Sequence, residues 1–373
     1  MQMTKYKLGD LIVQRREKNN NYDVPIRGVS KEGFIRAKQQ EADTSIYNVF
    51  YKYDFVFNPA RMELNSIALN IEYEKALCSS LYEVFYVKDE NIVLPEFLNL
   101  HIKRDEFARH CDYIGLGSAR EYCRFANISE FEIELPPIAV QQEIVDADRQ
   151  IRRRIRLNEQ MVEKLEATAQ ALYRHTFVDN IDKQNLPQGW RMGTFTEIAR
   201  LSGGGTPDTN NGEYWGGDIP FFTPADSTKI YCIKTDKMLT ELGFDNCSSK
   251  LYKKNTTFVT ARGTVGEVSL AGCNMAMNQS CYALLPKNCD APLFIHRFAI
   301  NTVNKLKEEA VGAVFNALVT KDFETTEVIV PPINKMIEYN SNVESVYGMA
   351  LIIQQENAKL TELQSLLLAK MGQ

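Results

Sequence analysis

The stretch Ile128-Ser-Glu-Phe-Glu-Ile-Glu-Leu-Pro-Pro-Ile138 decides how this chain is organised, because it returns 195 positions later as Phe323-Glu-Thr-Thr-Glu-Val-Ile-Val-Pro-Pro-Ile333. In each copy a short run rich in β-branched and aromatic residues, which is typical of a strand, ends at a Pro-Pro pair. About 40 residues without Gly or Pro follow the first pair, and in the second run Gly348 is the single Gly or Pro before the last two residues of the sequence. The repeat predicts two halves, each a globular segment followed by one long helix.

Further matches extend the repeat toward the start of each half. Tyr6-Lys-Leu-Gly9 matches Trp190-Arg-Met-Gly193 at an offset of 184, so the second copy is expected to carry about 11 more residues than the first. The Gly-rich stretch Leu201–Gly217 accounts for most of this difference. Between these points, Asp54-Phe-Val-Phe-Asn-Pro-Ala-Arg61 resembles Thr257-Phe-Val-Thr-Ala-Arg262.

The two long runs have the heptad spacing of a coiled coil. The positions that recur every seven residues are Ile144, Ile151, Asn158, Leu165 and Leu172 in the first run and Tyr339, Val346, Ile353, Leu360 and Leu367 in the second. A Pro-Pro pair suits a helix start, because proline tolerates the first turn. About 36 residues at 1.5 Å rise give a rod of roughly 50 Å, and two such rods from one chain are expected to pair. The alternative is two separate amphipathic helices, each lying on its own half.

The helix midpoints predict an antiparallel pair. They lie near residues 160 and 354, so facing residue numbers should add up to about 514, which puts Asn158 opposite the Asn357 region. A buried polar pair costs stability but fixes the register of a coiled coil. The alternative places both asparagines on the solvated edge.

The globular segments are predicted to be mixed α/β. The expected strands are Asn48–Phe57, Glu83–Val87, Phe131–Leu135, Thr256–Thr260 and Glu327–Val330. Helical patterns cover Pro95–Arg109 and Pro292–Lys307, and each begins with proline.

Composition and missing motifs argue against an enzyme. The chain has 373 residues, eight cysteines without a C-x-x-C pair and only four histidines, so a disulfide framework or zinc site is not expected. A phosphate-binding G-x-x-x-x-G-K-[ST] loop is absent, and no lysine has an acidic residue two positions before it, as many restriction nucleases do. No signal peptide or transmembrane run is visible, which predicts a cytoplasmic protein.

Strings in the second half point to a known family. Leu186-Pro-Gln-Gly-Trp190 precedes Ser202-Gly-Gly-Gly-Thr-Pro207, and Tyr214-Trp215-Gly-Gly-Asp-Ile-Pro220 follows. Gln141-Gln142 comes after the first Pro-Pro pair, with an acid at Glu143. With these strings, the repeat and the heptads, the chain resembles the specificity (S) subunit of type I restriction–modification systems over essentially its whole length. Two departures are the missing Gly-Gly-Thr-Pro string in the first half and Asn334-Lys335-Met336-Ile337 after the second Pro-Pro pair.

The resemblance implies an α+β fold: two mixed α/β target recognition domains with pseudo-two-fold symmetry, separated by two long helices paired as an antiparallel coiled coil. The expected parts are recognition domains at 1–136 and 179–331 and spacer helices at 137–178 and 332–373. Each domain would read one half of a bipartite target in double-stranded DNA. The helices would set the spacing and dock DNA methyltransferase (M) subunits, and a motor-nuclease (R) subunit can join them. This chain would hold no cofactor, while S-adenosylmethionine is expected in the methyltransferase.

Two other functions stay open. The chain could be the specificity partner of a fused methyltransferase–nuclease that cuts beside a bipartite site. A more distant alternative is a coiled-coil adaptor between proteins that does not contact DNA, which the net charge of −5 would favour.

No part of the chain is strongly basic. The four expected parts hold 18 Lys+Arg against 21 Asp+Glu, 7 against 6, 15 against 17 and 3 against 4. Counterion release from DNA would therefore give little affinity to the isolated chain, and partner subunits are expected to supply much of the phosphate neutralisation.

Local clusters remain candidates for DNA contact. Arg61 and Arg262 follow equivalent predicted strands, where arginine can bond a guanine or a phosphate. The other candidates are Lys31, Arg36 and Lys38 around Gly33, Arg120, the patch Lys250, Lys253 and Lys254 beside Tyr252, and the amides Asn278 and Gln279. For these residues the alternatives are internal ion pairs, solvated surface or amides that brace a loop. Arg152, Arg153 and Arg156 are expected on the outer face of the first helix, against spacer phosphates or an acidic partner, or simply in solvent.

Overall fold

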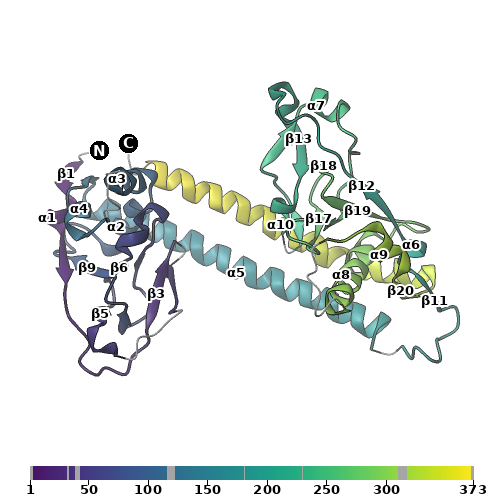
Figure 1. The fold of residues 1–373 in the computed structure, drawn as a ribbon, viewed down its shortest axis with the longest axis horizontal. Helices are drawn as coiled ribbons and strands as arrows, with labels where there is room; N and C mark the ends of the chain where they lie inside the picture. The colour runs from purple at the N-terminus through teal and green to yellow at the C-terminus, as the bar shows by residue number, and fades with distance from the viewer. Residues whose placement is uncertain are drawn as a thin grey trace. The chain divides into compact units, whose positions relative to one another are not determined.

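A computed structural model describes residues 3–31, 33–37, 43–115, 122–179, 181–228, 230–309 and 317–370 (Figure 1). The chain divides into two compact units, Met1–Arg154 with Leu360–Gln373, and Ile155–Lys359. Two long helices, α5 (Ile138–Phe177) and α10 (Ile333–Lys370), each begin one residue after a Pro-Pro pair, as predicted. Each unit contains one globular part and a stretch of both helices.

Both globular parts are closed by a pair of strands from their two ends. The first unit opens with β1 (Thr4–Lys7), α1 (Leu8–Leu11) and β2 (Ile12–Arg15), and the second with β11 (Arg191–Thr194), α6 (Phe195–Ile198) and β12 (Ala199–Gly203). β1 pairs antiparallel with β10 (Glu132–Leu135), and β11 pairs antiparallel with β20 (Glu327–Val330). In both units the last strand leads directly into the Pro-Pro pair and the long helix.

Strand pairing corrects the predicted register of the repeat. Thr4 faces Leu135 and Arg191 faces Val330, so the offset is 187 at the first strand and 195 at the last. The second copy therefore gains 8 residues between these strands rather than 11. The predicted match of Gly9 with Gly193 is wrong by three residues, because Gly9 lies in α1 whereas Gly193 lies in strand β11.

The central sheets have the same order in both units. One sheet is β2-β9-β6-β7 and the other is β12-β19-β16-β17-β14. The strand bounds are β6 (Phe55–Phe57), β7 (Ile67–Leu69), β9 (Glu83–Val87), β14 (Tyr231–Cys232), β16 (Thr257–Thr260), β17 (Val268–Ala271) and β19 (Cys281–Pro286). The first three neighbour pairs of each sheet are antiparallel. The resemblance between Asp54–Arg61 and Thr257–Arg262 therefore reflects equivalent strands, β6 and β16.

Outside the closing strand pair and the central sheet, the two units differ. The first unit adds two-stranded sheets from β3 (Arg27–Ser30) with β4 (Gly33–Arg36) and from β5 (Asn48–Tyr51) with β8 (Lys75–Cys78). The second adds a three-stranded sheet in the order β15-β13-β18, made of Lys237–Leu239, Trp215–Phe222 and Ala276–Met277. The mixed α/β content of both units is as predicted.

Two predicted elements are each split by a turn. The expected strand Asn48–Phe57 is β5 followed by β6, because Tyr53 adopts a φ of 65° and Asp54 accepts a hydrogen bond from the Tyr51 N–H at 2.7 Å. The expected helix Pro95–Arg109 is α2 (Pro95–Ile102) followed by α3 (Asp105–Gly115), whose two acidic residues in the first turn favour a new helix start. By contrast, α8 (Pro292–Glu309) agrees with its prediction.

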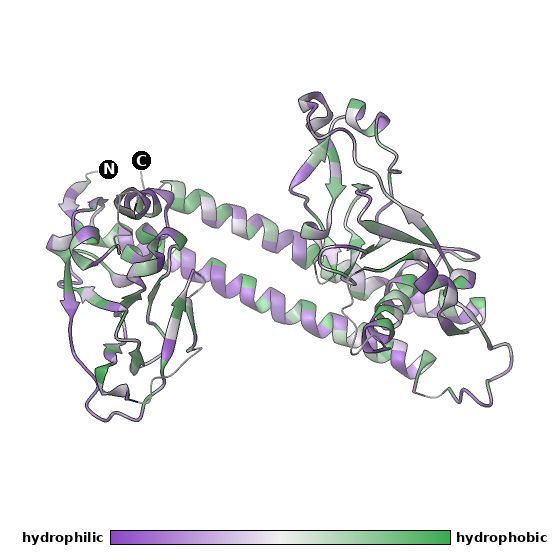
Figure 2. Cartoon of the chain, viewed as in Figure 1, coloured by the Kyte–Doolittle hydropathy of each residue, from purple (hydrophilic) through white to green (hydrophobic). Residues whose placement is uncertain are grey.

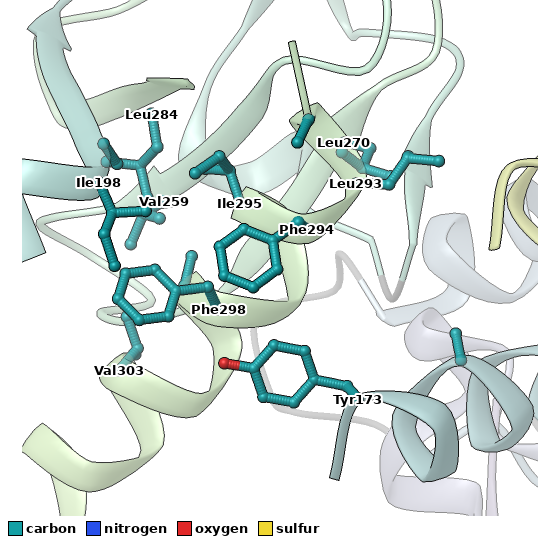
Figure 3. Close-up of a cluster of buried hydrophobic side chains, with 14 of the residues drawn as sticks. Tyr173, Ile198, Val259, Leu270, Leu284, Leu293, Phe294, Ile295, Phe298 and Val303 are labelled. Carbon is teal, nitrogen blue, oxygen red and sulfur yellow. The ribbon is translucent and has the colours of Figure 1, made fainter. Parts of the chain in front are cut away.

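The long helices contribute to the hydrophobic core of both units. In the second unit, Tyr173 of α5 packs against Phe294 of α8, with ring centroids 6.0 Å apart, and Figure 3 shows its ring directed toward this helix. Tyr339 of α10 contacts the same ring at 6.3 Å. In the first unit, Val145 of α5 is buried in the core, and Leu368 of α10 packs against it.

One predicted seam position is wrong. Leu172 is 38% exposed, whereas its neighbour Tyr173 is 5% exposed. A straight α-helix repeats every 3.6 residues, so a strict seven-residue pattern drifts around it. At this end α5 also packs on α8, and the larger tyrosine takes the buried position. Figure 2 shows that α5 is the more hydrophilic of the two long helices, consistent with wide solvent exposure.

Each long helix also holds the start of a helix in its own unit. Gln141 of α5 is buried, accepts from the Leu94 N–H at 3.1 Å and donates to the carbonyls of Ile92 and Pro136, both at 2.9 Å. In the second unit, Asn340 of α10 accepts from the Leu293 N–H at 2.9 Å. These amides satisfy donors at the N-terminus of α2 and α8, which helices leave without an internal partner.

Two buried histidines, one in each unit, make the stability of the fold depend on pH. His101 and His296 lie 195 positions apart, and burial lowers their pKa to about 4 and about 3, with Arg104 and Arg297 adding repulsion. Between these values and the ordinary pKa near 6.5, the unfolded chain binds protons that the folded chain does not. We expect the free energy of unfolding to fall as the pH drops from about 6.5 to 4, by up to about 1.4 kcal/mol per pH unit for each histidine.

Urea unfolding at several pH values, on the natural chain and on His296→Gln, tests this expectation. The variant should lose part of the pH dependence, because its side chain does not titrate. Carboxylates titrate in both proteins and cancel in the comparison. An identical slope for the two proteins would contradict the role of His296.

Candidate nucleic-acid interface

Arg61 and Arg262 occupy corresponding places in the two central sheets. Arg61 lies in a 3-10 helix, Pro59–Leu64, directly after β6, and Arg262 lies directly after β16. Both side chains are exposed. Among the residues that the structure describes, neither guanidinium has a hydrogen-bond or ion-pair partner, so both are available to an external anion or base.

The first unit presents a basic hairpin. Strands β3 and β4 pair antiparallel, and Ser30 faces Gly33, whose φ of 126° suits glycine at this turn. Lys31 in the turn and Arg36 at the end of β4 are both exposed. Lys38 and Arg120 lie outside the described residues.

The second unit has a basic patch around an anchored tyrosine. Lys250, Lys253 and Lys254 are exposed, but Tyr252 is buried. The Tyr252 hydroxyl is 2.9 Å from Ser202 Oγ and 2.8 Å from the Gly203 carbonyl. Its ring therefore supports the start of the Gly-rich loop and is not free to stack on a base.

The Gly-rich loop packs closely on the segment that carries Asn278 and Gln279. A Cβ atom on Gly204 would lie 2.2 Å from the carbonyl oxygens of both Met277 and Asn278, so only glycine fits. Asn278 Oδ1 accepts from the Ser280 N–H at 3.0 Å, and Gln279 Oε1 accepts from the Thr206 hydroxyl. Gln279 thus braces the Gly-rich loop, whereas Asn278 braces the turn of its own segment.

The arginines of α5 differ in their partners. Arg152 forms an ion pair of 2.7 Å with Asp148, one turn earlier on the same helix. Arg153 and Arg156 are exposed, and neither has a partner among the described residues. These two are the members of the cluster best placed for an external anion.

Asn158 and Asn357 are brought together in the second unit. Asn158 is 5% exposed, and its amide donates to Asn357 Oδ1 at 2.7 Å and to Glu356 Oε2 at 3.0 Å. Farther along, the Tyr339 hydroxyl donates to the Ala169 carbonyl at 2.9 Å. Residue numbers rise on α5 as they fall on α10, so the two helices run antiparallel within this unit.

Sequence reasoning missed Arg15, which is held in the first unit by three partners. Its guanidinium bonds both oxygens of the buried Asp54 carboxylate, at 2.6 and 3.1 Å, and lies between the rings of Tyr51 and Tyr86 at 4.8 and 4.5 Å from their centroids. Burial raises the pKa of the Asp54 carboxyl, so its ionised form depends on Arg15 and the Tyr51 N–H. An aspartate within the apolar run from Phe50 to Phe57 was the signal for a buried ion pair.

Other kinds of site are not found in the described parts of the chain. No group of three or more His, Cys, Asp or Glu side chains there is arranged to hold a metal ion. None of the helices described is both long and apolar enough to cross a membrane.

Comparison with known proteins gives consistent matches. Residues 2–167 and 187–362 each match the family of type I restriction modification DNA specificity domains. The chain is 24% identical over 356 residues to the type I restriction enzyme HindI specificity subunit of Haemophilus influenzae, covering 75% of this chain and 77% of that subunit. It is 30% identical over 155 residues to the MjaIX specificity subunit of Methanocaldococcus jannaschii, covering 40% of this chain and only 36% of that subunit.

A solved structure has a similar fold. The crystal structure of the type I restriction-modification system S subunit from M. genitalium matches with a TM-score of 0.62, covering 99% of this chain and 96% of that one at 14% identity. At this identity the match supports the fold, with its mixed α/β halves and long helices.

The Asn158 contact predicts a measurable loss of stability. Replacing Asn158 by alanine removes two hydrogen bonds at a buried position, so we expect the free energy of unfolding to fall by about 1–2 kcal/mol. Gln160→Ala, at an exposed position of the same helix, is the matched control. Urea unfolding measures both variants, and equal stabilities would show that the asparagine contact contributes nothing.

Proposed function

Because this chain belongs to the family of type I restriction modification DNA specificity proteins, we propose that it selects the DNA target of the complex, with each globular unit reading one half of a bipartite site. The observation that carries the proposal is the repeated sheet, β2-β9-β6-β7 and β12-β19-β16-β17. After the same strand of both copies stands an arginine that has no partner in the described parts of the chain. Two units that share the same central sheet and carry an arginine at the same place suit a protein in which each unit contacts one half of a DNA duplex target.

The differences between the units favour two different half-targets. The first unit carries the β3–β4 hairpin with Lys31 and Arg36, whereas the second carries the Gly-rich loop and the three-stranded sheet. Base contacts come from such variable elements, while the frame determines where they are presented.

We further propose that the helices fix the distance between the half-targets and dock methyltransferase subunits. Their free faces expose large apolar side chains, which mark protein contact sites when they gather on a surface. In the second unit they include Leu157, Met161, Met349 and Ile352, and in the first unit Leu363 and Leu366. A motor-nuclease subunit would join the same assembly.

In this proposal the chain itself does no chemistry. S-adenosylmethionine would bind the methyltransferase, and methyl transfer and cleavage would belong to the partner subunits. The specificity partner of a fused methyltransferase–nuclease is a second candidate with the same DNA role, and the partner gene distinguishes the two. An adaptor without DNA contact is less well supported, because Arg61 and Arg262 lack internal partners among the described residues.

Mapping of methylated adenines tests the proposal. Co-expression with the methyltransferase encoded beside this chain should yield a split motif with a fixed spacer in single-molecule sequencing. Replacing residues 1–136 by the corresponding part of a related subunit should change one half of the motif and leave the other half and the spacer intact. The matched control replaces residues 179–331 and should change the opposite half.

Two results would overturn this assignment. A continuous motif would leave one unit without a reading role. No motif at all, from a complex that assembles and binds S-adenosylmethionine, would favour the adaptor.

A further inference from the structure

We propose that a pocket in the first unit, beside the end of β2, binds phosphodiester groups of one half-target through Arg16 and Lys18. The inference rests on the proposed function and adds a contact site that Arg61 and the β3–β4 hairpin do not include.

The pocket is an open hollow of about 460 Å³. Its wall holds four cationic side chains, Arg15, Arg16, Lys18 and Arg124, and one carboxylate, Glu83. Tyr122 and Leu81, which also line it, are 52% and 76% exposed and form an accessible rim. Because the pocket is open and holds more cationic than anionic side chains, it suits an anion that extends along the surface.

Two of the four cations are neutralised within the protein. Arg15 is bound to the buried Asp54, as described above, and is fixed by Tyr51 and Tyr86. Arg124 lies 3.4 Å from Glu83, whose other oxygen accepts from the Phe125 N–H at 2.8 Å and from the Gln14 amide at 3.1 Å. Glu83 in the wall, and Asp54, which does not line the pocket, are therefore both engaged within the protein.

Among the described residues, the other two cations bond only neutral groups. Arg16 Nε donates to Gln14 Oε1 at 2.9 Å. Lys18 Nζ donates to the Ile46 carbonyl at 3.0 Å and to Asn48 Oδ1 at 2.7 Å. Both side chains are exposed, and Glu17 between them accepts from the Tyr51 hydroxyl at 2.9 Å without lining the pocket. Two uncompensated charges thus remain, although the chain as a whole is acidic.

The neighbourhood of the pocket favours duplex DNA over a small free anion. Pro59 and Ala60 line it, and the exposed Arg61 follows directly in the chain. Arg16 directly follows β2 and Lys18 stands two residues later in the chain, a spacing that suits contacts with successive phosphates of a nucleic acid backbone.

The second unit has no such charge at the equivalent place. With the offset of 187 at the first strands, Arg16 and Lys18 correspond to Gly203 and Gly205. A Cβ atom on Gly205 would lie 2.0 Å from Ser248 Oγ, so the Ser248 side chain packs against that position. The inferred phosphate contact is therefore confined to the half-target read by the first unit.

The salt dependence of DNA binding tests the inference. The full chain carrying Arg16→Gln and Lys18→Gln, assembled with its methyltransferase, is titrated with a duplex of the mapped target at several salt concentrations. Loss of two phosphate contacts should lower the slope of log K against log[salt] by roughly 1.8. The matched control is Lys5→Gln with Lys7→Gln, which removes the same charge from β1, where both lysines pair with exposed glutamates.

Three outcomes are distinguishable. An unchanged motif with a reduced slope only for the pocket variant supports the inference, because phosphate contacts carry no base information. Equal slopes for the pocket variant and the control overturn it while leaving the proposed function intact, provided that the natural complex methylates a split motif. A relaxed base preference in one half-target would overturn the phosphate assignment, and thermal melting of all variants checks that they fold alike.

Discussion

The pairing of the first strand with the last strand in each globular part is the constraint on which the structure depends. β1 with β10, and β11 with β20, bring the two ends of each globular segment together. The Pro-Pro pair follows at once, so each long helix starts from a fixed point of its own unit. Gln141 and Asn340 strengthen this connection, because a side-chain amide on each helix bonds the start of α2 or α8. The orientation of helix and sheet within a unit is thus set by backbone pairing and does not rely on exposed ion pairs such as Lys5–Glu132, which contribute little.

This constraint leaves the rest of each unit free to vary. The central sheet needs only apolar strands in a given order, and its first four strands are common to both units. Loops that leave the strand ends are not required for closure. In the first unit the end of β2 carries Arg16 and Lys18, while the equivalent end of β12 continues into glycines that pack on neighbouring backbone. This separation between a common sheet and variable loops suits a protein that selects DNA targets, because the loops can change their DNA contacts while the sheet stays the same.

Much of the fold could be predicted from the sequence because it rests on local periodicity. The long helices, β9, β20 and α8 follow from hydrophobic spacing and proline positions. The split of Asn48–Phe57 could not be predicted in the same way, because the turn depends on Tyr53 in a left-handed conformation and on Asp54 bonding Arg15, 39 positions away. The predicted register of the repeat was wrong for a related reason. Matching Tyr6–Gly9 with Trp190–Gly193 by sequence alone ignores which residues pair across the sheet, and the match is displaced by three residues. The Arg15 site is likewise long-range, since it joins three elements.

Net charge is a poor guide to DNA contact in this chain. A total of −5 argues against a nucleic-acid ligand if charges are taken as uniformly distributed. The structure shows that many carboxylates already have a partner: Asp54 bonds Arg15, Glu83 lies against Arg124, and Asp148 pairs with Arg152. A phosphate at the surface is affected mainly by the charges that have no ion-pair partner within the described residues. At Arg16, Lys18, Arg61 and Arg262 these charges are positive. Because Debye screening limits each exposed charge to roughly 8–10 Å at ordinary salt, these local residues decide the potential at a bound backbone, and distant acidic residues have little effect on it.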